Sequence, residues 1–504
     1  MHSPPAPTPW RPSPYFVIGG LFWALMTAAT WRVPMVGDFG THAAVVERLS
    51  ADWRHPTHPL AAVPGEGSPY YSPYALFQGL FAHAMGVPGR LVVKLAAPVN
   101  LIVLLTGIGR FTKVLTDRRW APVFALAAMV LLWGTERASW SGYLGLLSMT
   151  TTLAYPSAFA AGLAFHIWAL TGRTAREHER ERTSYVEHAA IGILVGLLML
   201  IHPITSVGTL VGVAAFVVGW QREWDGGTAR RWSLTVVAAV AVAASWPYFD
   251  AFSLGSSESA AVLDHVHRRL YTHIGGQFWL GLIGVPALWV RWRRSRRDPL
   301  VLMFAADCVL VAYGWISGHY TYGRLLGLTL VGPQFALAVE LARPGPYGLG
   351  RRLLAPVAAG AAALGFFTVQ AGAVVPRSMD PVGFDQPPDW RTYAWVTPYV
   401  EPGETVLADD YYISHSLPGY GAYLVAPTWP DPALAERDRW RRKQDVRRYL
   451  SPLSTATERA GIARRYRVHW LLLTSKQTLP PEAVAVTFSP VTGEVLARVP
   501  EFRL

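Results

Sequence analysis

The residues with the clearest potential for chemistry stand together in the run Gly37-Asp38-Phe39-Gly40-Thr41-His42, directly after the first long apolar stretch. A carboxylate held beside a hydroxyl group can act as a general base, which makes Asp38 the candidate catalytic residue. Asp38 could instead only cap a helix that begins at Phe39. His42 follows four residues later on the same helix face, so Asp38 and His42 could also belong to a divalent metal site for Mg²⁺ or Mn²⁺.

Basic side chains near the ends of the apolar stretches are candidates for binding a phosphate. Arg324 ends the run that begins at Gly318, between two such stretches. A guanidinium there could bind a lipid phosphate through two hydrogen bonds, or only anchor the helix end at the interface. His202 precedes Pro203 at another helix break and would lie near the same phosphate. The remaining basic candidates are His319, Arg268 and Arg269.

Aromatic and acidic groups in the loops are candidates for binding a sugar or an acceptor. Tyr70 and Tyr71 stand at the entry of a helix expected near Pro73, and Tyr320 and Tyr322 flank Thr321 in the loop that carries Arg324. Tyrosine rings pack against sugar rings, but they also anchor helices at membrane interfaces. Glu136 lies in a further loop. Like Arg268 and Arg269, it could bind an acceptor or a phosphate, or it could only belong to a solvated charged helix.

Long apolar stretches must position these groups. Eleven occur, each about long enough to cross the hydrocarbon core of a bilayer, although the third is short. They lie near 14–33, 91–109, 121–134, 148–170, 187–202, 203–220, 233–249, 275–290, 299–316, 325–341 and 353–374. The sequence therefore predicts a polytopic α-helical membrane protein, with a membrane part over residues 1–375.

The distribution of arginine and lysine predicts the orientation of these spans. With the N-terminus on the cytoplasmic side, the inner side carries 20 basic residues and the outer side of the membrane part carries nine. Cytoplasmic loops carry such an excess of Lys and Arg. This arrangement places the long loop 34–90 and the C-terminal region outside the cytoplasm. We expect two short helices within that loop, over Phe39–Leu49 and from about Pro73.

The region 376–504 has a different composition and predicts a small extracytoplasmic α/β domain. Strand-like and helix-like segments alternate along it. The expected strands are Thr405–Ala408, Val468–Leu473 and Val495–Val499, and the expected helices are Leu434–Leu450 and Thr455–Tyr466.

The composition limits the class of protein. The chain of 504 residues is 51% hydrophobic and only 15% charged, which indicates a large surface facing lipid. The net charge of +12 lies almost entirely in the membrane part, where it reports topology and does not indicate a nucleic-acid partner. Only four of the 45 basic residues are lysine, a bias typical of a high-GC bacterial genome.

Taken together, these features resemble the GT-C glycosyltransferases. The resemblance rests on a first span followed by an acidic residue, Asp38, at the start of a long outer loop, then on ten further spans and a soluble outer domain. The run Val406-Leu407-Ala408-Asp409-Asp410, with Leu417-Pro418-Gly419-Tyr420 and Val468–Leu473, is similar to the small domains of bacterial members. Many members carry two adjacent acidic residues in the first loop, whereas Asp38 stands between Gly37 and Phe39.

The resemblance implies a bacterial inner-membrane enzyme that uses a polyprenyl-phosphate sugar as donor. Asp38 would take the proton of an extracytoplasmic acceptor, and Arg324 with His202 would hold the lipid phosphate. A nucleotide-sugar donor is not expected, because the sequence has no Gly-rich phosphate loop. Two other functions remain open, a transporter or flippase for lipid-linked sugars and an inactive accessory protein of envelope assembly.

Overall fold

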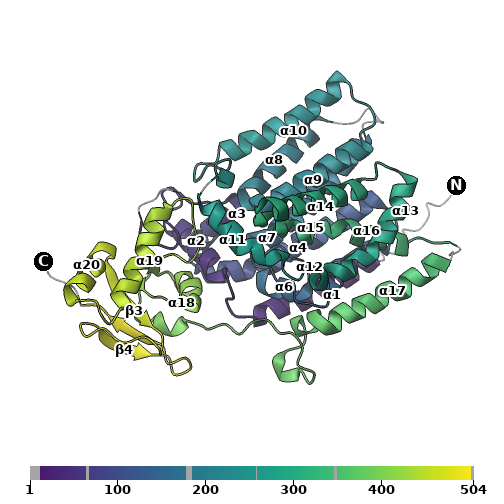
Figure 1. Cartoon of the computed structure of the whole chain (residues 1–504). Coiled ribbons are helices and arrows are strands. Elements are labelled where there is room, and N and C mark those ends of the chain that lie inside the picture. Colours follow the sequence, from purple (N-terminus) through teal and green to yellow (C-terminus); the bar gives the residue numbers. More distant parts are fainter. Residues whose placement is uncertain (1–11, 64–66, 178–183, 257, 346–348, 501–504) are drawn as a thin grey trace, which may run out of the picture.

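The computed structural model describes residues 12–63, 67–177, 184–256, 258–345 and 349–500. Helices form a bundle, and a small domain with a β-sheet lies at one end of that bundle, beside α2 (Figure 1). The helices of the bundle and its loops are α1 (Pro14–Arg32), α2 (Phe39–Ala51), α3 (Pro73–Met85), α4 (Gly89–Leu115), α5 (Ala121–Leu131), α6 (Leu146–Thr152), α7 (Pro156–Glu177), α8 (Tyr185–Ile201), α9 (Pro203–Trp220), α10 (Gly226–Ala244), α11 (Glu258–His267), α12 (Ile274–Phe278), α13 (Val285–Arg294), α14 (Pro299–Ser317), α15 (Leu326–Thr329), α16 (Val331–Leu341) and α17 (Leu349–Gly365).

Six helical segments of the described chain are long and apolar enough to cross a membrane. Two pairs of helices, bent by 119° and 75°, raise the number to eight if each pair is one span. The predicted number of eleven is not confirmed. One reason is length, since α5 has 11 residues and therefore extends only about 16 Å. Another reason is a helix break, since the run 148–170 is divided into α6, which ends at Thr152, and α7, which begins at Pro156.

The two short helices expected in the loop 34–90 are both present, as α2 and α3. The sequence explains the bounds of α3. Ser72 caps its first turn by accepting a hydrogen bond from the Ala75 amide, and Pro73 occupies the first helical position. Gly86 ends it in the left-handed conformation, with φ at 61°.

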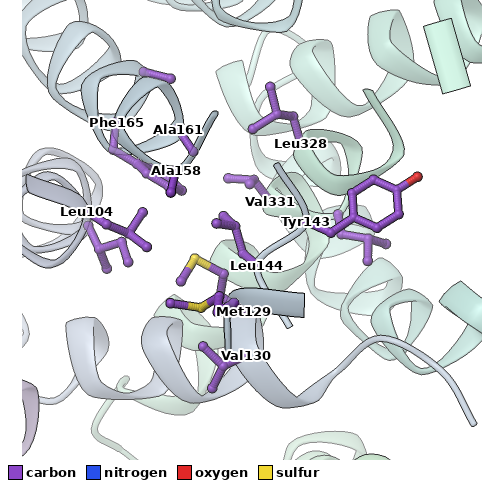
Figure 2. Close-up of a cluster of buried hydrophobic side chains, with 14 of the residues drawn as sticks. Leu104, Met129, Val130, Tyr143, Leu144, Ala158, Ala161, Phe165, Leu328 and Val331 are labelled. Carbon is purple, nitrogen blue, oxygen red and sulfur yellow. The ribbon is translucent and has the colours of Figure 1, made fainter. Parts of the chain in front are cut away.

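A continuous apolar core holds the bundle together. Side chains from α4, α5, α7 and the segments around α15 meet there (Figure 2). The labelled residues are Leu104, Met129, Val130, Tyr143, Leu144, Ala158, Ala161, Phe165, Leu328 and Val331. Tyr143 also donates its hydroxyl hydrogen to the carbonyl of Gly323 over 3.2 Å. This bond ties the core to the 3₁₀ segment Tyr320–Leu325, which carries Arg324.

The C-terminal region is an α/β domain with one five-stranded sheet in the order β2-β1-β3-β5-β4. Strand β1 pairs in parallel with β2 and β3, and β5 pairs antiparallel with β3 and β4. The elements are β1 (Thr405–Leu407), α18 (Tyr411–Ser416), β2 (Tyr423–Leu424), α19 (Glu436–Leu450), α20 (Ala456–Tyr466), β3 (Val468–Leu473), β4 (Val484–Phe488) and β5 (Val495–Arg498). The three strands and two helices expected from the sequence are confirmed, whereas β2 and β4 were not predicted.

Strand β3 organises the core of this domain because its side chains alternate between the two faces of the sheet. Leu471 and Leu473 join one buried cluster with residues of α19 and α20. Trp470 and Leu472 join a second cluster on the opposite face, together with residues of α18. Helices therefore cover both faces of the sheet, α19 and α20 on one face and α18 on the other.

Helix α2 contacts the C-terminal domain at the level of the backbone. Gly40 lies so near α18 that a Cβ atom built there would stand 2.1 Å from the carbonyl oxygen of His415. From the other side, a Cβ atom on Gly419 would stand 2.9 Å from the Cα atom of Gly40. Arg48, at the far end of α2, donates to the carbonyl oxygens of Gly421 and Ala422 over 2.9 and 3.2 Å. The absence of side chains at Gly40 and Gly419 thus sets the position of the domain.

We expect Gly40→Ala to loosen this docking, because the added methyl group meets backbone that no rotamer change can move. The variant should unfold at a lower temperature than the wild type and should be cleaved faster by protease between the bundle and the domain. Gly461→Ala is the matched control, since a Cβ atom at this position in α20 meets open space. Alanine there should be neutral or stabilise the helix by about 1 kcal/mol. Equal melting temperatures for Gly40→Ala and the wild type would contradict this account.

Candidate active site

The backbone around Gly37 presents Asp38 at the start of α2. Gly37 has φ at 58°, in the left-handed region that glycine adopts without strain. Asp38 occupies the N-cap position, but its side chain accepts no hydrogen bond from the helix. The capping interpretation of Asp38 is therefore wrong for this structure. Its carboxylate is 38% exposed and accepts a hydrogen bond of 2.6 Å from the indole Nε1 of Trp429.

A segment of the C-terminal domain, residues 424–431, holds Trp429 over Asp38. We call this segment the strap. One end is fixed where the Leu424 amide donates to the carbonyl of Leu60 over 2.8 Å. The other end is fixed at the buried Asp431, whose Oδ2 accepts a 2.6 Å bond from Ser68 and lies 3.4 Å from His58 Nε2. Both ends thus attach to the loop that follows α2, and Trp429 between them reaches Asp38 at the start of α2.

The ring of His42 packs between two tyrosines. Its centroid lies 4.8 Å from that of Tyr155 and 6.4 Å from that of Tyr70. Burial lowers the pKa of His42 to about 4, and the charge of Asp38 opposes this shift only in part. His42 is therefore neutral near pH 7.

The residues present do not fit a metal ion at this place. Asp38 and His42 supply only two groups, fewer than the three or four protein ligands of a zinc site. Among the described ranges, no group of three or more His, Cys, Asp or Glu side chains could hold a metal. We therefore derive no step through a metal ion.

Arg324 and His202 form the cationic part of the site. Arg324 Nη2 donates to His202 Nε2 and to the carbonyl of Ser141, each over 3.1 Å. Because His202 Nε2 accepts this bond, its proton resides on Nδ1, which lies 2.7 Å from Thr205 Oγ1. Arg324 Nε is buried and has no hydrogen-bond partner among the described residues. An unsatisfied buried guanidinium nitrogen favours an anion as the missing partner.

A small pocket opens at this cluster. Polar groups and apolar side chains both line it, which suits a phosphate attached to a lipid. The lining residues are Ser141, Gly142, Ala161, His202, Ile204, Thr205, Arg324, Leu325 and Leu328.

Tyr70 connects the acidic and the cationic parts of the site. Burial raises the pKa of its hydroxyl, the charges of Asp38 and Asp431 raise it further, and the charge of Arg324 opposes them. Tyr70 thus lies within the electrostatic field of both Asp38 and Arg324. Four of the candidates, Asp38, Tyr70, Arg324 and His202, therefore share one region.

Other candidates have partners of their own. His319, which is exposed, pairs with Asp264 at 3.2 Å. Glu136 pairs with His273 at 3.3 Å. Tyr71 is fully buried and donates its hydroxyl hydrogen to the carbonyl of Thr57, so its ring has a structural position in this conformation.

The remaining candidates lie around α14 and the 3₁₀ segment Arg268–Tyr271. The ring centroid of Tyr320 is 5.7 Å from that of Tyr271, and Tyr322 lies 5.8 Å from Tyr313. Arg268 and Arg269 are both exposed, and the charge of Arg269 acts on Tyr411 of the C-terminal domain.

Sequence reasoning missed the groups that the C-terminal domain brings to Asp38, namely Trp429, His415 and Asp431. They lie about 390 residues further along the chain, in segments without a recognisable motif. A tryptophan or histidine in a short connection gives no signal of its partner, so only the tertiary structure identifies them.

The fold can be compared with solved structures. The chain matches the cryo-EM structure of the mycobacterial arabinofuranosyltransferase AftD with a TM-score of 0.54 and 14% identity, over 96% of this chain and 40% of AftD. It matches ArnT from Cupriavidus metallidurans bound to undecaprenyl phosphate with a TM-score of 0.52 and 14% identity, over 97% of this chain and 98% of ArnT. The chain has the GT-C glycosyltransferase fold.

A further GT-C structure widens this comparison. The archaeal oligosaccharyltransferase AglB from Archaeoglobus fulgidus, in complex with an inhibitory peptide and a dolichol-phosphate, matches with a TM-score of 0.50 and 11% identity. The match covers 91% of this chain and 69% of AglB. No protein-family model and no curated protein sequence matches the chain. The GT-C assignment therefore rests on the fold.

The low pKa of His42 predicts a pH dependence of stability. The unfolded chain binds a proton at this residue below about pH 6.5, whereas the folded protein binds it only near pH 4. Stability that is present above pH 6.5 is therefore lost progressively as the pH falls toward 4. The melting temperature should fall less between pH 7 and pH 5 in His42→Gln than in the wild type, by at least about 2 °C. His55→Gln, at an exposed histidine of the same loop, should keep the wild-type slope.

Proposed function

We propose that this protein is a glycosyltransferase that moves a hexosyl or pentosyl group from a polyprenyl-phosphate donor to a hydroxyl acceptor. The observation that carries the proposal is the placement of one carboxylate, Asp38, and one guanidinium with an unsatisfied nitrogen, Arg324, in the field of the same tyrosine, Tyr70. A transfer from a lipid phosphate needs these two groups, a base for the acceptor and a cation for the departing phosphate.

In the proposed reaction the lipid phosphate lies at the pocket beside Arg324 and His202. Arg324 holds it by charge-assisted hydrogen bonds. Asp38 takes the proton from the acceptor hydroxyl, and the oxygen forms a bond to the anomeric carbon as the bond from that carbon to the phosphate oxygen breaks. The electron pair of the broken bond leaves with the lipid phosphate. Arg324 stabilises the charge that develops there.

The proposed location is the inner membrane of a bacterium, with the N-terminus in the cytoplasm. The excess of arginine on alternate loops supports this orientation. The C-terminal domain and Asp38 then lie on the outer side, where the extracytoplasmic acceptor would be a glycan, lipid or protein of the cell envelope. ArnT was solved with undecaprenyl phosphate and AglB with a dolichol-phosphate, so lipid-phosphate binding occurs on this fold.

The first test uses purified protein in lipid nanodiscs with a panel of polyprenyl-phosphate sugars. We expect the wild type to consume at least one donor and Asp38→Asn to lower the rate by roughly 100-fold or more, because the amide cannot accept the proton. Asp52→Asn is the matched control at the other end of α2, where the carboxylate is exposed and bonds only to nearby amides.

The outcomes separate the alternatives. Transport of an intact lipid-linked sugar across the bilayer, without consumption, would indicate a flippase. No consumption and no transport with any donor would indicate an accessory protein. A full rate in Asp38→Asn would remove Asp38 from the role of base.

The second test concerns Arg324. We expect Arg324→Gln to raise the KM for the donor roughly tenfold or more, because a charge-assisted hydrogen bond to the phosphate is lost. Binding of the product, undecaprenyl phosphate, should weaken in parallel when it is measured by native mass spectrometry. Arg54→Gln, at an exposed arginine beside Trp53 on the same loop, should leave both values unchanged. A donor KM in Arg324→Gln equal to that of the wild type would contradict the phosphate assignment.

A further inference from the structure

His415 of the C-terminal domain is buried against Asp38 with one ring nitrogen unused. The residue is 1% exposed and lies on α18. Its Nδ1 is 2.7 Å from the carbonyl oxygen of Tyr411. A carbonyl only accepts, so Nδ1 carries a proton in either charge state of the ring.

The other ring nitrogen, Nε2, points toward the candidate base. It is buried, has no hydrogen-bond partner among the described residues and lies 4.0 Å from Asp38 Oδ1. When His415 is neutral and Asp38 is ionised, both of these atoms are acceptors. A buried acceptor without a donor is costly, and a proton that reaches Asp38 during the reaction and passes to Nε2 removes this cost.

Trp429 determines which oxygen of Asp38 faces His415. Its Nε1 donates to Oδ1, the same oxygen that His415 approaches. In the described part of the chain no hydrogen bond is formed to Oδ2 of Asp38 by another side chain. The two oxygens of Asp38 therefore have different surroundings. Oδ1 contacts the C-terminal domain, and Oδ2 is available to an acceptor hydroxyl.

From these contacts we infer that His415 is the proton acceptor behind Asp38, so that the C-terminal domain completes the site. The inference rests on the proposed function and deepens it. The proton leaves the acceptor hydroxyl for Asp38 Oδ2 as the new bond to the anomeric carbon forms. The carboxyl group then rotates about its Cβ–Cγ bond, which exchanges the positions of the two oxygens, and passes the proton to Nε2 of His415. The ring becomes an imidazolium paired with the regenerated carboxylate. His415 acts through Asp38 and is therefore a positioning residue.

Few other groups around His415 can exchange a proton. At the start of α2, the charged residue that faces His415 is Asp38. In the strap, the ring of Trp429 lies with its centroid 5.6 Å from that of His415 and does not titrate. From α18 itself Tyr411 lies at 4.1 Å, and burial raises the pKa of its hydroxyl, with Asp38 raising it further and Arg269 opposing. Tyr411 therefore stays neutral over the working pH range. Trp390, at 6.1 Å, does not titrate.

The experiment compares His415→Gln with the wild type in the donor-consumption assay over pH 4.5 to 9. We expect kcat at pH 7 to fall roughly 10- to 100-fold with the donor KM within twofold, since the pocket at Arg324 is untouched. His469→Gln, at an exposed histidine of β3 in the same domain, should match the wild type.

A measurement without turnover covers the case in which His415→Gln does not fold. In the folded wild type, the ring nitrogens of His415 are observed by ¹⁵N NMR at pH 7, and the spectrum is compared with that of Asp38→Asn. The Nε2 resonance should move in the variant, because this nitrogen lies 4.0 Å from the carboxylate in the wild type and faces a neutral amide in the variant.

The outcomes distinguish the role of His415 from the proposed function of Asp38 as the base. An unchanged kcat in His415→Gln, or an unchanged Nε2 resonance of His415 in Asp38→Asn, overturns the role of His415 while Asp38 can still be the base. Full activity of Asp38→Asn overturns the proposed function itself, and the inference with it.

Discussion

The contact between the backbone of α2 and the C-terminal domain is the constraint on which the rest of this structure depends. Gly40 and Gly419 allow the two elements to approach without intervening side chains. At that separation the carboxylate at the start of α2 comes within hydrogen-bonding distance of a domain tryptophan. A larger residue at Gly40 would move the domain outward. Asp38 would then lose Trp429 and His415 together.

The site is divided between two parts of the chain with different physical properties. The helical bundle supplies the cation, held by His202 and a backbone carbonyl beside a pocket that polar and apolar side chains both line. The α/β domain supplies the polar groups that surround the carboxylate. In the proposed reaction a lipid-borne phosphate lies near the first part and a hydrophilic acceptor near the second. The division therefore matches the chemistry of a reaction at a membrane surface.

Within the described residues, the candidate site contains two buried nitrogens without a hydrogen-bond partner, Arg324 Nε and His415 Nε2. A buried polar atom without a partner costs free energy. Their presence in the candidate site is consistent with hydrogen bonds that are completed by a substrate and by a moving proton. The same feature would be a defect in a purely structural interface.

Similarity to AftD and ArnT at 14% identity, with TM-scores above 0.5, shows how little of this fold depends on particular residues. Apolar stretches of sufficient length can be exchanged for one another as long as volume and pattern are retained. The fold accordingly leaves the sugar and the acceptor open, since specificity resides in the few polar groups of the site.

The sequence by itself determined the class of protein, the helices of the first loop, the alternation of basic loops and the strands β1, β3 and β5. These features follow from local composition and periodicity, which one segment carries alone. It also singled out Asp38, Arg324 and His202. The sequence did not determine the number of spans, because helix breaks such as that at Pro156 depend on packing. Nor did it identify Trp429, His415 and Asp431 as neighbours of the first loop. Contacts across some 390 residues are decided by how the domain docks, and only the tertiary structure contains that information.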